Sequence, residues 1–369
     1  MNSSNDRGPN ERAVAAAQAF LLATKSYWTT RIYPAVRAEY DERVARVEAK
    51  PRDADDVAAL MRSSTLYQYY AWLERHLQRF KYAGRYGLHT TLAGHRAEAV
   101  AELHERAAAD LLELHPELPL PRYYTSVDIH QHPGGVWSDP VAGLVYERGA
   151  RSTMPLSGAK HRDLHGRLTD LALAEAPNAA RILDLACGFG KSSLPFAVSR
   201  PAAQIDAIDL AAPCLEVAAR EAATVGARNV RCRQMSATAT DYANGTFDLV
   251  TSTMLLHELP PPEIERTFAE AARVLKPGGK MVHLDFLPQV QPQAQGAAEP
   301  FARFIHYGHG RRNNEPFMEP LAKLDLEALL TRLGFTDVRI EALEEAAGTL
   351  DPSYAAWRFP WTAIVASRA

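Results

Sequence analysis

The stretch Asp184–Ser193 reads DLACGFGKSS and directly follows RIL, the start of a run typical of a strand. Glycine-containing turns of this kind hold a nucleotide triphosphate, a dinucleotide, or a nucleoside without phosphate. A phosphate loop needs a glycine five residues before the triplet Gly190-Lys191-Ser192, where this chain has Leu185. A dinucleotide fingerprint needs a third glycine where this chain has Ser193. The turn by itself therefore favours neither phosphate ligand, and the rest of the chain has to decide.

Around this turn, apolar runs typical of strands alternate with helical stretches. The seven runs are RILDLA, AQIDAIDL, VRCRQMSA, FDLVTSTM, KMVHLDF, FTDVRIEAL and FPWTAIVAS. We expect helical stretches to separate the first five runs, which predicts parallel strands joined by right-handed crossovers in an open, doubly wound sheet. Only a loop joins the last two runs, so they are expected to pair antiparallel at one edge. The predicted class is α/β, with seven strands.

The N-terminal region has a different pattern. From about residue 11 to residue 118, apolar residues recur at helical spacing, as in VAALMRSSTLYQYYAWLERHLQRF, which predicts three to five helices. The segment PLPRYYTSVDIHQHPGGVWSDPVAG is rich in proline and glycine and is typical of a connection. We therefore divide the chain into a helical region, residues 1–150, which covers the site or mediates dimerisation, and an α/β domain, residues 151–369.

Composition limits the partners. The 369 residues are 47% hydrophobic and 23% charged, with a net charge of -3 and no long run of one sign, so we expect neither nucleic acid nor a membrane as partner. The three cysteines form no CxxC pair, which argues against disulfides and zinc and favours the cytoplasm. The start MNSSNDRGPNER lacks the features of a secretion signal. A small-molecule substrate and a homodimer are compatible with these properties.

Motifs beyond the turn decide the ligand. Asp209 ends the second strand about twenty residues past the turn, FDLV begins the fourth strand, and AARVLKPGGKMV places a Pro-Gly-Gly turn before the fifth. Together these residues resemble the class I S-adenosylmethionine-dependent methyltransferases of the small-molecule type. The resemblance covers about residues 155–369 and implies a Rossmann-like fold and S-adenosylmethionine as the cofactor.

The resemblance also implies cofactor-binding residues. Asp209 would hold the ribose hydroxyls and Leu210 would pack on adenine, while the glycines of the turn would let the backbone approach the cofactor. Ser236 stands where relatives often have an aspartate for the adenine amine, and Ala186 replaces the family's first glycine. The complete expected set is Asp184, Cys187, Gly188, Gly190, Asp209, Leu210, Ser236, Ala237 and Thr253.

Catalytic and substrate residues are expected near the carboxyl ends of the strands. His257 in STMLLHELPP is either a general base or a packing residue, and Glu258 is expected to be a solvated helix-start residue. Tyr146 in VYERGARST is the second catalytic candidate, and Arg151 is a candidate for a carboxylate of the ligands. The long segment after the fifth strand is either a substrate wall or packs on the helical region. Its substrate candidates are Tyr307, Arg311 and Asn314.

Other readings of the histidines and of the reaction remain open. His130 and His132 form an H-x-H pair that can bind metal on a strand, but no third ligand is evident, and we expect no metal. The leading function is methyl transfer to O, N or C of a small molecule, with secondary metabolism suggested by the resemblance. One alternative is attack on the aminopropyl arm of the cofactor, which releases methylthioadenosine and can close azetidine-2-carboxylate. Another is a non-catalytic cofactor-binding subunit.

Overall fold

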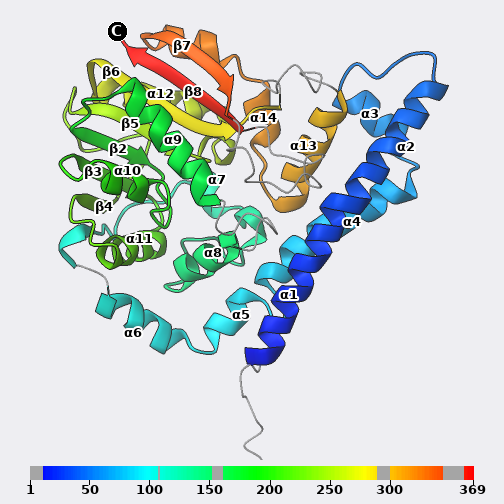
Figure 1. Cartoon of the computed structure of the whole chain (residues 1–369), viewed down its shortest axis with the longest axis horizontal. Coiled ribbons are helices and arrows are strands. Elements are labelled where there is room, and N and C mark those ends of the chain that lie inside the picture. Colours follow the sequence, from blue (N-terminus) through cyan, green and yellow to red (C-terminus); the bar gives the residue numbers. More distant parts are fainter. Residues whose placement is uncertain (1–10, 107–108, 152–160, 289–299, 344–360) are drawn as a thin grey trace, which may run out of the picture.

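The computed structural model describes residues 11–106, 109–151, 161–288, 300–343 and 361–369. In these residues, eight strands form one sheet in the order β1-β4-β3-β2-β5-β6-β8-β7 (Figure 1). The strands are β1 (Leu112–Glu113), β2 (Arg181–Leu185), β3 (Gln204–Asp209), β4 (Val230–Gln234), β5 (Phe247–Thr253), β6 (Leu275–Phe286), β7 (Phe335–Ala342) and β8 (Trp361–Arg368). β1 to β6 pair in parallel, and β8 is antiparallel to both of its neighbours. The predicted mostly parallel sheet with an antiparallel edge is confirmed.

Two details differ from the expectation. β1, a strand of two residues, comes from the N-terminal region and adds an eighth strand beside β4. The helix expected between β4 and β5 is absent, because residues 235–246 form turns and an isolated bridge from Ser236 to Ala239. This link reads MSATATDYANGT, and its Thr, Asn, Asp and Gly residues favour turns over a helix.

Helices cover both faces of the sheet. One face packs on α9 (His161–Glu175), α10 (Ser193–Ser199) and α11 (Ala212–Thr224), and the other on α12 (Pro261–Val274) and α15 (Leu326–Arg332). The neighbouring β2 residues Ile182 and Leu183 are both fully buried, each in the cluster on its own side. A parallel strand that is covered on both faces reads as a continuous apolar run, which is why RILDL predicted β2.

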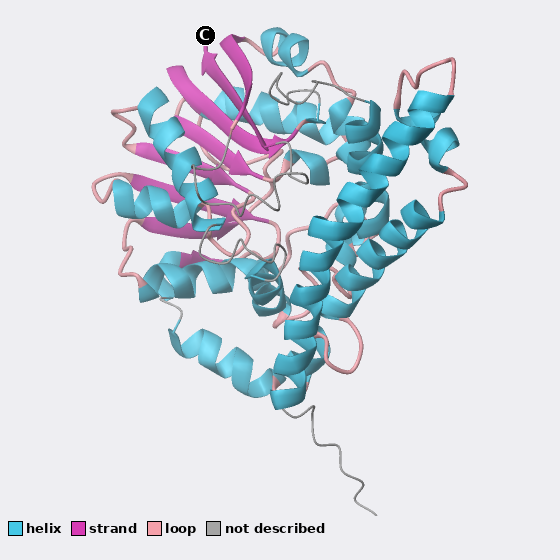
Figure 2. Cartoon of the chain, turned by 45° about the vertical axis from the view of Figure 1, so that its right-hand side comes forward, coloured by secondary structure: helices cyan, strands magenta, loops and turns pink. Residues whose placement is uncertain are grey.

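The N-terminal region contains more helices than expected. Residues 11–106 form six α-helices and one π-helical turn. They are α1 (Glu11–Tyr27), the π turn (Trp28–Ile32), α2 (Tyr33–Arg46), α3 (Ala54–Met61), α4 (Thr65–Tyr82), α5 (Leu88–Ala93) and α6 (Arg96–Arg106). α6 packs beside α11, whereas Figure 2 shows α1, α2 and α4 beyond the end of the sheet to which the parallel strands point. They therefore cover the edge at which ligands bind in such folds.

The long segment after β6 packs on the N-terminal helices. Residues 289–299, the first part of that segment, lie outside the described residues. The second part forms α13 (Pro300–Asn313), followed by α14 (Met318–Ala322). Phe301, Phe304 and Tyr307 of α13 are buried in one apolar cluster with residues of α1 to α4. Of the two expectations for this segment, packing on the helical region is the one that its aromatic residues fulfil.

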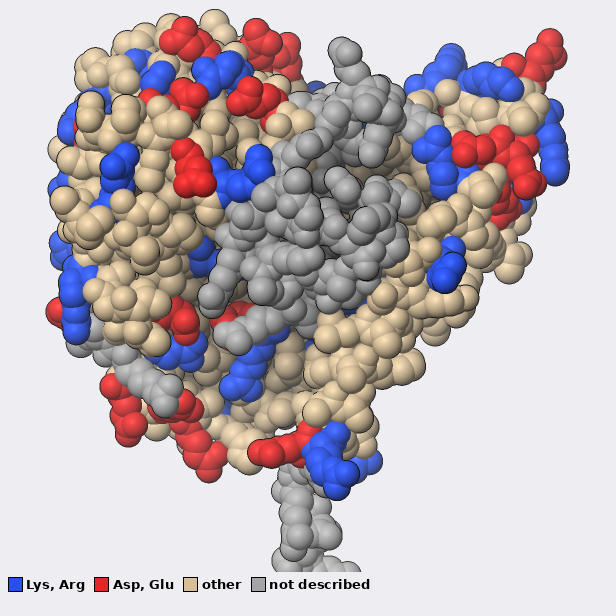
Figure 3. All heavy atoms as spheres, viewed as in Figure 1, with Lys and Arg blue, Asp and Glu red and all other residues tan. Residues whose placement is uncertain are grey.

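The outer flank of the helical region is largely uncharged. On the face drawn in Figure 3, basic and acidic side chains intermingle over the sheet part, whereas much of the α1 flank carries neither. Phe20 and Tyr27 on α1, and Tyr69, Trp72 and Phe80 on α4, are large apolar side chains that remain at least half exposed. Exposed apolar surface of this kind is typical of an association face. The homodimer and the division of the chain at residue 150 stay predictions.

Candidate active site

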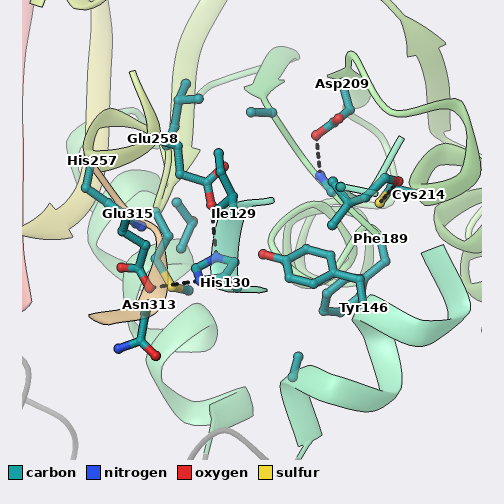
Figure 4. Close-up of a pocket in the computed structure, with 18 of the residues that line it drawn as sticks. Ile129, His130, Tyr146, Phe189, Asp209, Cys214, His257, Glu258, Asn313 and Glu315 are labelled. Atoms are coloured by element: carbon teal, nitrogen blue, oxygen red, sulfur yellow. Dashed lines mark hydrogen bonds and ion pairs between the residues drawn. The ribbon is translucent and has the colours of Figure 1, made fainter. Parts of the chain in front are cut away.

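A cavity of about 270 Å³ lies between the carboxyl ends of the parallel strands and the N-terminal helices. Its lining combines the turn after β2, the ends of β3, β4 and β5, and residues of α1, α4, α8 (Ala142–Arg151) and α13. Figure 4 shows Asp209 on one side of this space and Glu258, His130 and Glu315 on the other. The cavity therefore joins the expected cofactor turn to a cluster of charged side chains.

The turn after β2 rests on a buried carboxylate. Asp184 is fully buried and does not line the cavity, and its Oδ2 atom accepts hydrogen bonds from the hydroxyls of Ser192 and Ser193 at 2.6 and 2.5 Å. Burial raises the pKa of Asp184 to about 6, although the two serines lower it. Asp184 thus holds the start of α10 beneath the turn. Asp184 therefore supports the turn from below, whereas we expected it to contact the cofactor.

Cys187 and Gly188 line the cavity, as expected, but Gly190 does not. A Cβ atom at Gly190 would lie 2.9 Å from the Cβ of Ala218 in α11, so its glycine is needed for the packing of the turn on α11. Burial raises the pKa of the Cys187 thiol well above its ordinary value, which fits a packing residue and not a nucleophile.

Replacing Gly190 by alanine is expected to lower the free energy of unfolding by about 2–4 kcal/mol, from left-handed backbone strain plus overpacking. The φ angle of Gly190 is 82°, and the new Cβ meets Ala218. Gly226→Ala is the matched control, because its φ is 72° with no atom near the added Cβ, and should cost about 1–2 kcal/mol. Equilibrium denaturant unfolding measures both. Equal losses in the two variants would contradict a packing role for Gly190.

Asp209 is placed to receive hydroxyl groups. It lines the cavity, and its two oxygens accept hydrogen bonds from the backbone amides of Gly188 and Ala211, both at 2.8 Å. A carboxylate has about four acceptor positions, so roughly two remain for a ligand. Burial raises the pKa of Asp209 to about 6, and the two amides oppose this rise. These features fit the ribose hydroxyls of S-adenosylmethionine.

The other expected cofactor residues also lie on the cavity. Leu210, Ser236, Ala237 and Thr253 all line it. The Ser236 hydroxyl is 2.8 Å from that of Thr238, and the Thr253 hydroxyl is buried with no hydrogen-bond partner among the described residues. An apolar wall, a free hydroxyl and the Asp209 carboxylate suit a nucleoside without phosphate, so the residues present fit the cofactor.

Both catalytic candidates line the cavity. Gly143 lets α8 approach α11 closely, since a Cβ there would lie 1.9 Å from the Pro213 carbonyl oxygen. This contact places Tyr146 at the turn, with its ring 5.5 Å from that of Phe189. His257 is buried on a short 3-10 helix (Leu256–Glu258), and its Nδ1 is 2.7 Å from Oδ1 of Asp285.

Glu258 is not the solvated residue that we expected. It lines the cavity, and its side chain is only 23% exposed. The two ring nitrogens of His130 lie 3.0 Å from carboxylate oxygens of Glu258 and Glu315. Burial alone would lower the pKa of His130, but the charge of Glu315 and its hydrogen bonds to both carboxylates raise it to about 10. His130 is therefore an imidazolium held between two carboxylates.

The substrate candidates lie elsewhere. Tyr307 is buried among the N-terminal helices, and Arg311 pairs with Glu319 at 2.6 Å on the surface. Asn314 donates a hydrogen bond to the carbonyl oxygen of Asp128, also at the surface. These three residues do not line the cavity, because the face of α13 that reaches it carries His309 and Asn313. Arg151 ends α8, and its side chain lies outside the described part of the structure.

Several lining residues were not among the site candidates named from the sequence. Tyr123 and Tyr124 come from the proline-rich connection, while Glu74 and Lys81 come from α4. Helical periodicity marked the α4 residues only as part of an amphipathic helix. Glu315 directly follows Asn314, which has a φ of 59°, but nothing in the sequence pairs it with His130.

The H-x-H pair does not lie on a strand. His130 has a φ of 56° within a short 3-10 turn, and both ring nitrogens of His132 are buried without a hydrogen-bond partner among the described residues. In the described part of the chain, no group of three His, Cys, Asp or Glu side chains is arranged to hold a metal ion. Among the described helices, none is long and apolar enough to span a membrane.

Comparisons with known proteins agree with this site. Residues 182–279 match the family model of a methyltransferase domain. The chain is 38% identical over 122 residues to a demethylmenaquinone methyltransferase of Thermus thermophilus, a match that covers 33% of this chain and 53% of that protein. The chain thus spans about half the length of this relative. It is 31% identical over 195 residues to the ubiquinone biosynthesis O-methyltransferase of Xanthomonas axonopodis pv. citri, covering 52% of this chain and 74% of that protein.

Solved structures show a weaker likeness. The crystal structure of the [4+2]-cyclase SpnF has a TM-score of 0.40 at 20% identity, over 55% of this chain and 80% of that one. Phosphoethanolamine N-methyltransferase 2 of Haemonchus contortus, in complex with S-adenosyl-L-methionine, has a TM-score of 0.40 at 16% identity, over 54% and 52%. The sheet topology, the fitting cofactor site and the match over 74% of a curated methyltransferase lead to one conclusion. The chain belongs to the class I S-adenosylmethionine-dependent methyltransferases.

Proposed function

We propose that the protein transfers a methyl group from S-adenosylmethionine to a small molecule that binds inside the cavity. The observation that carries this proposal is the single cavity that joins Asp209 to His257 and Glu258. The two sequence relatives named above act, by their names, in quinone biosynthesis, one of them as an O-methyltransferase. Their names support a small acceptor, and the polar groups in the cavity favour an oxygen or nitrogen nucleophile over carbon.

When bound, S-adenosylmethionine supplies a methyl group on a positively charged sulfur that leaves as a neutral thioether. The chain's residues then have to position the acceptor, exclude water and remove one proton. Positioning two reactants in line supplies much of the rate in such transfers. Residues of α1 and α4 line the cavity opposite the strand ends, so these helices are the part of the chain that would exclude water from a bound acceptor.

His257 is the best-placed base for the acceptor's proton. With Asp285 accepting from Nδ1, the remaining nitrogen, Nε2, is the one that takes a proton. Burial lowers the pKa of His257, but the charge of Asp285 and the hydrogen bond to it raise the pKa above its ordinary value. The neutral form needed in a base therefore becomes available only as the pH rises through this raised value.

The products formed from S-adenosylmethionine test the proposal. Purified protein is incubated with S-adenosylmethionine, with and without a set of phenols, quinols and amines. Mass spectrometry then quantifies S-adenosylhomocysteine and methylthioadenosine against a sample without protein. Acceptor-dependent S-adenosylhomocysteine is the expected result. Enzyme-dependent methylthioadenosine without an acceptor would replace methyl transfer by attack on the aminopropyl arm.

The His257 role makes a pH prediction. Asp285→Asn removes the charge that raises the pKa of His257, so the low-pH limb of kcat/KM should move to lower pH. His257→Gln should lower kcat about 100-fold, with the affinity for S-adenosylhomocysteine unchanged. Steady-state rates across pH 5–9 and calorimetric titration measure the two effects. An unchanged kcat in the Gln variant would show that His257 only packs.

A further inference from the structure

The middle of the cavity is built around one carboxylate, Glu258. Its Oε1 atom accepts a hydrogen bond from His130, and its Oε2 atom has no hydrogen-bond or ion-pair partner among the described residues. The cluster of Glu258, Glu315 and the His130 imidazolium carries one net negative charge. Glu315 cannot give up its charge easily: burial alone would raise its pKa, but His130 lowers it to about 2.

The loop that carries His130 is fixed by three hydrogen bonds to α4 and α13. His130 and Gln131 have φ angles of 56° and 57°, a conformation that costs energy in residues other than glycine. Gln78 of α4 donates to the His130 carbonyl oxygen, while Gln131 donates to the carbonyl oxygens of Arg75 and Arg312. Strained backbone that its surroundings hold in place is typical of functional sites. Here it fixes the imidazolium that orients Glu258.

Three tyrosines share the cavity with this carboxylate. Tyr123, Tyr124 and Tyr146 line the same cavity, and Figure 4 shows the hydroxyl end of Tyr146 pointing toward His130. Burial raises the pKa of each hydroxyl, and the charge of Glu258 raises it further in all three. The other charged groups that raise these pKa values, Asp209 and Glu263, are also carboxylates. Together with the one net negative charge of the cluster, these carboxylates favour a negative potential in this part of the cavity.

An aromatic wall around a free carboxylate oxygen suits a cation. A hydroxyl or quinone oxygen would gain little from this negative potential, whereas an ammonium group gains from the charge, from the ring faces and from a charge-assisted hydrogen bond to Oε2. A sulfonium lacks the hydrogen to donate. The lining also contains Glu74 and three lysines. Lys25 and Lys81 lie on α1 and α4, where burial lowers the pKa of both, and Lys191 lies in the turn after β2.

We infer that Glu258, oriented by His130 and walled by Tyr123, Tyr124 and Tyr146, is a binding site for a protonated aliphatic amine. This inference rests on the proposed function, because it names the substrate chemistry of the same cavity. The amine has two sources: the head of a separate acceptor, or the α-ammonium group of S-adenosylmethionine itself. If a separate acceptor is the source, Glu258 selects alkyl amines over the oxygen acceptor that one relative's name suggests.

Binding measurements on Glu258→Gln distinguish the two sources without any turnover. Calorimetry compares S-adenosylhomocysteine, which carries the α-ammonium group, with methylthioadenosine, which lacks it. A second titration adds n-hexylamine, or hexan-1-ol as its neutral partner, to protein saturated with S-adenosylhomocysteine. Glu258→Asp, which keeps the charge, is the conservative variant, and thermal unfolding confirms that both variants fold.

If the cofactor is the source of the amine, Glu258→Gln should lower the affinity for S-adenosylhomocysteine at least tenfold and leave the affinity for methylthioadenosine unchanged. Glu258→Asp should then recover part of the lost affinity. If a separate acceptor is the source, Glu258→Gln should leave the affinity for S-adenosylhomocysteine unchanged and lower the affinity for hexylamine at least tenfold. The affinity for hexanol should stay the same. If Glu258→Gln changes the affinity for neither S-adenosylhomocysteine nor hexylamine, or if it lowers the affinity for methylthioadenosine by the same factor, the ammonium site is refuted. The proposed function fails separately, by the absence of S-adenosylhomocysteine as a product.

Discussion

Replacing Glu74 by alanine is expected to lower the free energy of unfolding by about 3–5 kcal/mol, the range for breaking a buried ion pair on one side. Glu74 lies on α4 with its side chain 5% exposed, and it accepts hydrogen bonds from Nδ1 of His309 and Nε of Arg312 on α13. Removing it leaves the guanidinium of Arg312, 11% exposed, without its carboxylate. The contact between α4 and α13 then lowers the stability of the fold, because it leaves a buried charge without its partner.

The charge state of Glu74 sets the pH range of this contribution. Burial raises the pKa of Glu74, but the charges of Arg312 and His309 lower it below the ordinary value of 4.5. A carboxyl whose folded pKa is lowered stabilises the fold above its unfolded pKa. This stabilisation is lost as the pH falls through the lowered value, so the difference between the variant and the parent should shrink in acid.

Equilibrium unfolding in urea at neutral pH measures the effect. Asp41→Ala is the control, because its pair with Arg37 is exposed, 56% and 38%, and should contribute about 0.5 kcal/mol or less. The double variant Glu74→Leu with Arg312→Met should recover much of the loss, since apolar residues can replace a buried pair. A Glu74→Ala loss no larger than that of the control would show that the pair does not stabilise the fold.

The sequence predicted the sheet because its signal is local. Runs such as RILDL and AQIDAIDL place apolar residues on both faces, so each run indicates a buried strand without knowledge of its neighbours. The helix expected between β4 and β5 failed for the opposite reason, since it was inferred from the alternation of elements and not from residues 235–246 themselves. β1 has only two residues and leaves no periodicity to detect.

The site was predicted in part. Asp209 and Leu210 end a strand, and topology alone brings that end to the cavity. Whether a residue of the turn faces the ligand or the core depends on packing, so Asp184 and Gly190 were placed in the site although they lie beneath it. The pairs Glu74 with Arg312 and His130 with Glu315 join residues 238 and 185 positions apart. No local pattern reveals such contacts.

Asp209→Asn is expected to weaken S-adenosylhomocysteine binding about 100-fold, the loss of one to two charge-assisted hydrogen bonds. Its carboxylate already accepts from the amides of Gly188 and Ala211, so the amide of asparagine would oppose one of these donors and offer a poorer acceptor to ribose. Calorimetric titration measures the affinity.

The control is Asp206→Asn. Asp206 lies on the same strand but does not line the cavity, and it forms an ion pair with Arg181 at 2.8 Å. The Asp206→Asn substitution should therefore leave cofactor binding unchanged. Since the ribose contact does not involve the amino-acid part of the ligand, the defect should be equal for S-adenosylhomocysteine and methylthioadenosine. A defect confined to S-adenosylhomocysteine would instead place Asp209 at the methionine end of the ligand, and unchanged affinity for both would remove it from the cofactor site.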